Sequence, residues 1–199
     1  MPGLYSRYIK PIHAFGDVAA IAVSAAVSYG ITHNSIAGFL TGQYGYFLIC
    51  AIVAWFICSN LLGIYKFYRV TRLLMVMFNV MKVLLLYILL IEAFMNILNI
   101  NFYSRTYLLY HYLILLLLII FWRVAVITSL RIYRRKGYNY RKVIIVGYST
   151  PGKELRRFFN HRPEYGYRFL GFFDDKNDGQ PGVVGSIDDI EQFVLQNEV

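Results

Sequence analysis

Acidic residues are almost absent from the first 130 positions of this chain, which contain only Asp17 and Glu92. Apolar residues make up 58% of the whole sequence and the mean hydropathy is +0.49. Ordinary soluble domains contain roughly 45–50% apolar residues, so this composition excludes a water-soluble domain for the first part of the chain. Residues 131–199, in contrast, contain nine of the eleven acids and twelve of the twenty bases. The sequence therefore divides into an apolar part and a polar part.

Cysteine is scarce as well. Cys50 and Cys58 lie eight residues apart in one apolar stretch, and no cluster of Cys or His residues surrounds them. This excludes a disulfide framework and gives no sign of a metal site. We interpret both cysteines as small apolar packing residues.

Four apolar stretches are long enough to cross a membrane, because about 20 helical residues span a hydrocarbon core about 30 Å thick. They cover residues 13–31, 44–65, 75–98 and 107–129. Arg7 and Lys10 precede the first stretch, as they would in a secretory signal. The three further stretches favour a retained anchor.

Lys and Arg are absent from residues 33–43, and the other predicted outer loop contains only Arg105. Eleven bases gather on the opposite side, in residues 7–10, 66–72 and 131–142. Because cytoplasmic loops carry the excess of Lys and Arg, we expect both termini to be cytoplasmic. The bases of residues 131–142 suit anionic lipid headgroups, so the net charge of +9 needs no nucleic-acid partner.

The polar part has the pattern of a small α/β fold. A β-branched run ends at Gly147, Pro151 is suited to begin a helix, and a second apolar run ends at Asp174. The expected elements are strands over 142–147, 168–173 and 182–185 and helices over 151–161 and 186–196. A doubly wound sheet needs about five strands, so we expect this fold to be incomplete at Val199.

The order strand, glycine turn, helix, strand and acid is typical of a dinucleotide-binding unit. The candidate cofactor-binding residues are Gly147, Ser149, Gly152 and Asp174. Ser149 stands where the fingerprint has its middle glycine, which lets a pyrophosphate approach the backbone. The pattern therefore favours a fold that keeps the turn without a cofactor or binds something else, with intact dinucleotide binding as the alternative.

Two bases lie inside the predicted spans. Lys82 and Arg123 are each about five or six residues from the cytoplasmic end of their span, so we expect their side chains to snorkel towards the headgroups. The functional alternative is a basic pocket that binds a lipid phosphate.

Glu92 lies well inside the third span, where a lone carboxylate would cost about 3 kcal/mol or more. The hairpin of the third and fourth spans turns near Asn101, which places His111 at the same depth as Glu92. We predict that these two side chains approach each other, with Asn96 and Tyr107 nearer the outer face. The alternative is a protonated Glu92 that bonds to another helix.

Several motifs occur in a familiar order. They are Gly63-Ile64-Tyr65 followed by Arg69 and Arg72, Tyr103-Ser104-Arg105, Arg123, residues 141–147 and Gly171-Phe172-Phe173-Asp174-Asp175. Together they resemble the N-terminal half of bacterial polyprenyl-phosphate hexose-1-phosphate transferases, which initiate exopolysaccharide, capsule and O-antigen synthesis.

This resemblance implies a four-helix transmembrane domain over 1–130, a basic juxtamembrane hinge over 131–141 and a partial Rossmann-like, CoA-binding-like cytoplasmic domain over 142–199. It also implies the bacterial inner membrane and polyprenyl phosphate as a partner. The family's catalytic domain uses an Asp-Glu pair and magnesium to transfer a hexose phosphate from a UDP-sugar to undecaprenyl phosphate. No residue of this chain matches that pair, so no catalytic residue, metal or cofactor is assigned and we expect the chain alone to be inactive.

The same sequence features are compatible with two other functions. The arrangement of four spans and a Rossmann-like domain also resembles that of membrane-bound nucleotide-sugar dehydratases and epimerases. A non-enzymatic membrane scaffold is the third hypothesis. A homo-oligomer is compatible with each of them.

Overall fold

The structure is a computed structural model that describes residues 4–65, 73–100, 102–176 and 179–197. The chain divides into two compact units, Met1–Val126 and Ile127–Val199. The predicted loop bases Lys66, Arg69 and Arg72 and the predicted turn residue Asn101 lie outside the described residues, as does the side chain of Arg7.

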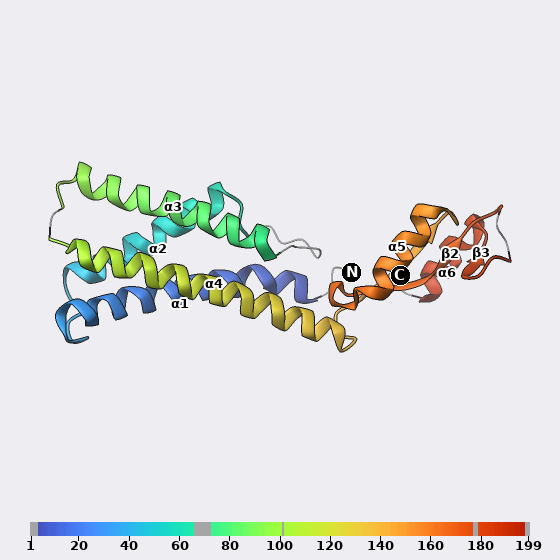
Figure 1. The fold of residues 1–199 in the computed structure, drawn as a ribbon, viewed down its shortest axis with the longest axis horizontal. Coiled ribbons are helices and arrows are strands. Elements are labelled where there is room, and N and C mark those ends of the chain that lie inside the picture. Colours follow the sequence, from blue (N-terminus) through green and yellow to red (C-terminus); the bar gives the residue numbers. More distant parts are fainter. Residues whose placement is uncertain (1–3, 66–72, 101, 177–178, 198–199) are drawn as a thin grey trace. The chain divides into compact units, whose positions relative to one another are not determined.

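The first unit is built from three long helices and the greater part of a fourth, which run side by side (Figure 1). Each is long and apolar enough to cross a membrane. They are α1 (Leu4–His33), α2 (Gln43–Leu61), α3 (Leu73–Ile97) and α4 (Arg105–Arg135). The four predicted apolar helices are therefore confirmed.

Helix α2 ends at Leu61, four residues before the end predicted from the apolar run. Gly63 adopts a left-handed conformation, with φ of 62°. The backbone N–H of Ile64 donates to the carbonyl of Ser59 at 3.2 Å, and that of Gly63 donates to Asn60 at 3.2 Å. A glycine in this conformation ends a helix because the following N–H groups turn back onto the last free carbonyls. Hydropathy alone does not register such a stop.

Large aromatic side chains form the centre of the helical unit. Trp55, Tyr87 and Tyr107 are fully buried, together with Leu115 and Ile119. The rings of Trp55 and Tyr87 meet edge to face with centroids 5.6 Å apart, an arrangement that aromatic pairs prefer. These residues join α2, α3 and α4 into one core.

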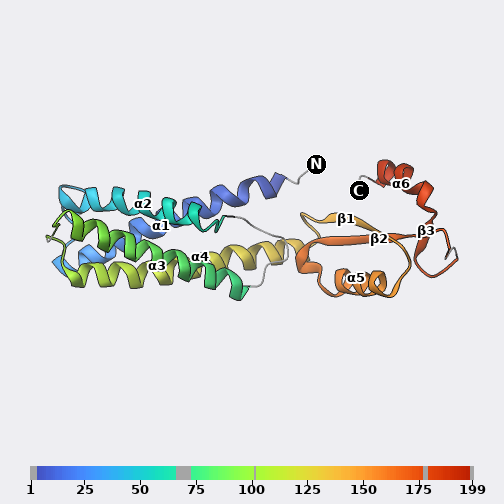
Figure 2. The ribbon, with the colours of Figure 1, turned by 90° about the horizontal axis from the view of Figure 1, so that it is seen from above.

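The second unit contains a three-stranded parallel sheet in the order β1-β2-β3, which confirms the predicted α/β pattern. Its strands are β1 (Arg141–Val146), β2 (Tyr167–Phe173) and β3 (Val183–Gly185). Its helices are α5 (Thr150–His161) and α6 (Ile190–Asn197), with single 3-10 turns over Pro163–Tyr165 and Ile187–Asp189. Figure 2 shows α5 and α6 on opposite faces of the sheet.

The predicted hinge is shorter than expected, because α4 continues as far as Arg135. Beyond it, Gly137 with φ of 84° and Asn139 with φ of 53° turn the chain into β1. Glycine adopts this conformation freely and asparagine tolerates it better than most residues. The core of the second unit lies on β1 and β2, where Ile145, Phe172 and Phe173 are buried.

Candidate functional site

The turn after β1 has the local geometry of a nucleotide-binding turn. Gly147 ends the strand with φ of 95°, a conformation that glycine adopts without strain. Ser149 caps α5, because its hydroxyl oxygen accepts the backbone N–H of Gly152 at 3.3 Å; such a cap contributes about 1 kcal/mol. A side chain at Gly152 would come within 2.9 Å of the Gly147 carbonyl oxygen and 3.3 Å of Phe172. Gly152 thus allows α5 to pack closely on the sheet.

Asp174 closes this turn from the end of β2. One carboxylate oxygen accepts the backbone N–H of Tyr148 at 2.6 Å, and the other accepts that of Lys176 at 2.8 Å. The fold thus brings together Gly147, Ser149, Gly152 and Asp174, the four residues singled out in the sequence. Two turn N–H groups, those of Tyr148 and Gly152, already have acceptors within the protein.

A buried ion pair joins α1 and α4. The Arg123 guanidinium donates to the Asp17 carboxylate at 2.7 Å, and the side chains are 3% and 0% exposed. The same carboxylate oxygen accepts the indole N–H of Trp55 at 3.2 Å and the hydroxyl of Tyr65 at 2.7 Å. Four segments of the unit therefore meet at one carboxylate.

This ion pair corrects the prediction that Arg123 snorkels towards the headgroups. Arg123 is instead turned into the bundle, because Asp17 offers an ionic partner at the same level. Lys82 is exposed on α3, one residue before the buried Val83. The structure does not bring Lys82 and Arg123 into a shared contact among the described residues.

Sequence reasoning missed the partner of Arg123, although a signal was present. Asp17 is the only acid of the first apolar stretch, and Arg123 is the only base within the fourth. Ionisable residues inside a helical membrane unit commonly pair with one another. The sequence could therefore have indicated that the single acid of the first apolar stretch and the single base of the fourth are partners.

The predicted contact between Glu92 and His111 is wrong. Glu92 accepts the hydroxyl of Tyr112 at 3.1 Å, so its partner is the next residue of α4. The ring nitrogens of His111 lie 3.0 Å from the Ser24 hydroxyl and 2.9 Å from the Tyr87 hydroxyl. The depth was right, but one residue along a helix turns the side chain by about 100°. His111 faces the core and Tyr112 faces α3 near its surface.

Asn96 and Tyr107 were expected nearer the outer face. Asn96 lies one turn after Glu92, closer to the end of α3, and its side-chain amide donates to the Glu92 backbone carbonyl at 2.8 Å. Tyr107 is fully buried and lies one turn before His111, with the two rings stacked at 6.4 Å between centroids.

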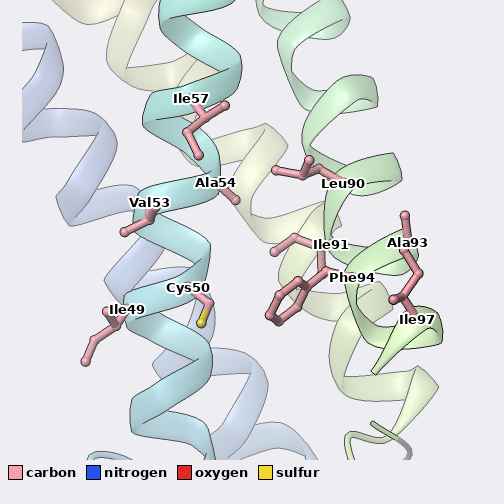
Figure 3. A pocket seen from close by; sticks show the side chains of 10 residues that line it. All are labelled: Ile49, Cys50, Val53, Ala54, Ile57, Leu90, Ile91, Ala93, Phe94 and Ile97. Atoms are coloured by element: carbon pink, nitrogen blue, oxygen red, sulfur yellow. The ribbon is translucent and has the colours of Figure 1, made fainter. Parts of the chain in front are cut away.

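Two sizeable cavities lie among the described residues of the helical unit. The first, of about 450 Å³, is an apolar groove between α2 and α3, where Leu90, Ile91 and Phe94 face Ala54 and Cys50 (Figure 3). The second, of about 580 Å³, lies between the end of α3 and the start of α4 and has a polar lining. The residues that line it are Glu92, Met95, Asn96, Ile100, Tyr103, Arg105, Leu108, Leu109 and Tyr112. Across the part of the chain that the structure describes, no three potential ligands gather to hold a metal ion.

Comparison with known families places the fold. The family described as CoA-binding domain matches residues 60–199, well over half of the chain. A search of curated proteins found no match. The match begins at the end of α2 and continues through α3, α4 and the parallel sheet. This chain is therefore a member of the CoA-binding domain family.

Proposed function

We propose that this chain anchors an initiating sugar transferase to the bacterial inner membrane and supplies part of its regulatory or scaffolding domain. The observation that carries the proposal is the family match over residues 60–199, since this family is found in polyprenyl-phosphate-type sugar transferases. The enzyme would transfer a hexose phosphate from a UDP-sugar to undecaprenyl phosphate. Catalysis would reside in a domain other than the two units described above.

Three acids of the sheet unit support this proposal, because each accepts a backbone hydrogen bond within the unit. Asp174 binds the turn after β1, and Asp175 accepts the backbone N–H of Ile187 at 2.8 Å. Asp189 accepts the backbone N–H and hydroxyl of Ser186 at 2.9 and 2.6 Å. These hydrogen bonds from Ser186 lower the pKa of the Asp189 carboxyl. These hydrogen bonds commit one or both oxygens of each carboxylate to contacts within the protein.

Exposed apolar side chains support the membrane placement of the helical unit. Leu89, Leu117 and Phe121 are 66%, 67% and 70% exposed on the outside of the bundle. Large contiguous apolar surfaces are rare on soluble proteins and mark interaction sites or membrane contact. The inside of the same bundle contains the ion pair and the hydrogen-bonded His111, as expected where polar groups in hydrocarbon must find partners within the protein.

The proposed topology places both termini in the cytoplasm, with Ser35 outside. Inversion would move the basic segment 131–142 to the wrong side, against the Lys and Arg bias of cytoplasmic loops. In a variant without Cys50 and Cys58, an impermeant thiol reagent added to whole cells should label Ser35→Cys and spare Asn139→Cys. Permeabilised cells provide the control, since both positions should then react. Labelling of position 139 in intact cells would refute the topology. The companion positions 69 and 101 lie outside the described residues.

The family name implies coenzyme A, but two features of the turn after β1 disfavour a pyrophosphate there. A bound phosphate needs free N–H groups at the helix N-terminus, whereas Ser149 and Asp174 already accept two of those in the turn. The Asp174 carboxylate would also repel a phosphate placed beside it. We therefore propose that Gly147, Ser149, Gly152 and Asp174 preserve the shape of a nucleotide-binding turn without a cofactor.

The basic pocket suggested for Lys82 and Arg123 is also revised by the structure. Asp17 already neutralises Arg123, so of the two bases inside the predicted spans only the exposed Lys82 could contact an anionic lipid. We propose that Lys82 and the juxtamembrane bases attract anionic headgroups, including that of polyprenyl phosphate. Each such base contributes about 1 kcal/mol near an anionic surface.

The proposed function is tested by measuring UMP release from UDP-glucose or UDP-galactose with undecaprenyl phosphate and magnesium. The purified 199-residue chain should give no UMP above background, because none of its residues matches the catalytic Asp-Glu pair of the family that it resembles. The product of the whole reading frame should release UMP. NAD-dependent conversion of the UDP-sugar would instead favour the dehydratase alternative, and a reading frame without any further domain would favour a scaffold.

A further inference from the structure

The two acids of the helical unit have different environments. Asp17 is fully buried and has the guanidinium of Arg123 at 2.7 Å. Glu92 is half-buried, and its carboxylate accepts one hydrogen bond, from the neutral hydroxyl of Tyr112 at 3.1 Å. Among the described residues no base lies within ion-pair distance of Glu92. A carboxylate at this depth needs a compensating partner, and the protein supplies only a weak one.

The polar cavity of about 580 Å³ lies directly beside Glu92. Its lining includes one base, the exposed Arg105, and hydroxyl and amide donors that are already engaged. The Tyr112 hydroxyl donates to Glu92, and the Tyr103 hydroxyl donates to the Gln43 carbonyl at 2.6 Å. One amide N–H of Asn96 donates to the Glu92 carbonyl. The Glu92 carboxylate and the Asn96 amide oxygen therefore remain as acceptors for a ligand, and Tyr103 and Tyr112 line the same cavity.

A carboxylate beside aromatic side chains offers recognition chemistry for an organic cation. A carboxylate accepts charge-assisted hydrogen bonds from an ammonium group, and the face of a tyrosine ring attracts a cation within about 6 Å. The volume of the cavity exceeds that of a single ion and suits a small molecule or a lipid headgroup.

We propose that this cavity binds a primary ammonium group, with Glu92 as its counter-ion and Tyr103 and Tyr112 beside it. The rim carries the opposite charge, from exposed Arg105 and from the N-terminal end of α4, where the helix dipole is positive. A ligand with an ammonium and a nearby phosphate, such as a phosphoethanolamine group, satisfies both charges. Such a group is available as a phospholipid headgroup and as a free solute. The lipid source rests on the membrane placement proposed above; the chemistry of the cavity does not.

The test uses the intact chain in nanodiscs that contain phosphatidylethanolamine, phosphatidylcholine and phosphatidylglycerol in equal amounts, with native mass spectrometry of the lipids retained. The unaltered chain should retain phosphatidylethanolamine preferentially. Glu92→Gln, which keeps the shape of the side chain, should lose that preference by about tenfold, the equivalent of one charge-assisted hydrogen bond. Glu154→Gln, at an exposed position of α5, is the matched control and should leave it unchanged.

A second measurement separates the two sources. Soluble phosphoethanolamine, added to the chain in detergent, should raise the unfolding temperature of the unaltered chain and not that of Glu92→Gln if the ligand is a free solute. Retention of the lipid without this shift identifies the headgroup as the source. Equal retention of phosphatidylethanolamine by the unaltered chain and by Glu92→Gln, with no change of unfolding temperature in either, overturns the proposal. If Glu92→Gln does not fold, equal retention of phosphatidylethanolamine and its N-methylated analogue phosphatidylcholine by the unaltered chain overturns it. None of these readouts depends on transferase activity, so the proposed function can fail separately.

Discussion

Replacing Arg123 with Met should lower the free energy of unfolding of the helical unit by about 3–5 kcal/mol. The substitution removes the guanidinium and leaves the Asp17 carboxylate buried, with only Trp55 and Tyr65 as neutral donors. A buried charge without its partner retains its full desolvation cost, whereas the similar volume of Met limits any effect of a cavity. Thermal unfolding in detergent, followed by size-exclusion chromatography, measures the loss.

A double-mutant cycle shows whether the ion pair is the cause. Asp17→Asn combined with Arg123→Met leaves no buried charge, so the double variant should be more stable than Arg123→Met alone. Lys82→Met provides the control, because it removes an exposed base from α3 and should change stability by less than about 0.5 kcal/mol. Simple additivity of the two single changes would contradict a direct interaction between Asp17 and Arg123.

Gly16→Val should destabilise the same unit by about 2–3 kcal/mol, the effect of forcing extra atoms into a packed interface. A β-carbon at Gly16 would lie 1.9 Å from the indole nitrogen of Trp122 and 2.0 Å from the neighbouring ring carbon. The whole indole would have to move, and Trp122 precedes Arg123 just as Gly16 precedes Asp17. Small residues at helix interfaces let the backbones approach closely. The absence of a side chain at Gly16 therefore helps to hold the ion pair at bonding distance.

A second double-mutant cycle tests the contact between Gly16 and Trp122. Trp122→Ala removes the ring, so its combination with Gly16→Val should lose less stability than the sum of the two single changes. Gly30→Val is the matched control within α1, because a β-carbon there meets only Ile36, at 3.3 Å. A loss for Gly30→Val as large as that for Gly16→Val would show that helix propensity, and not the close approach to Trp122, is responsible.

Periodicity and residue type were enough to predict the elements of both units. The four apolar runs, the β-branched strand before Gly147 and the helix start at Pro151 correspond to observed helices and strands. These features are local: the length of an apolar run, the conformations open to glycine and proline, and the side chains that can cap a helix depend on neighbours in the sequence. The end of α2 was misjudged because it depends on a single left-handed glycine within an otherwise apolar run.

The depth of a residue along a helix follows from counting, and the sequence alone placed Glu92 level with the region of His111 and Tyr112. Which of the two Glu92 meets depends on the rotation of α3 and α4 about their axes, and packing decides that rotation. His111 is held inside by Ser24 on α1 and Tyr87 on α3, so Tyr112 is left facing Glu92. Likewise, Arg123 could be recognised as a costly charge, but its pairing with Asp17 needed α1 and α4 to be neighbours. Sequence by itself determined the elements, their order and the depth of each charge, because these are properties of the chain. Only tertiary structure decided the partners, because a contact between distant residues depends on which helices pack together and on which faces they share.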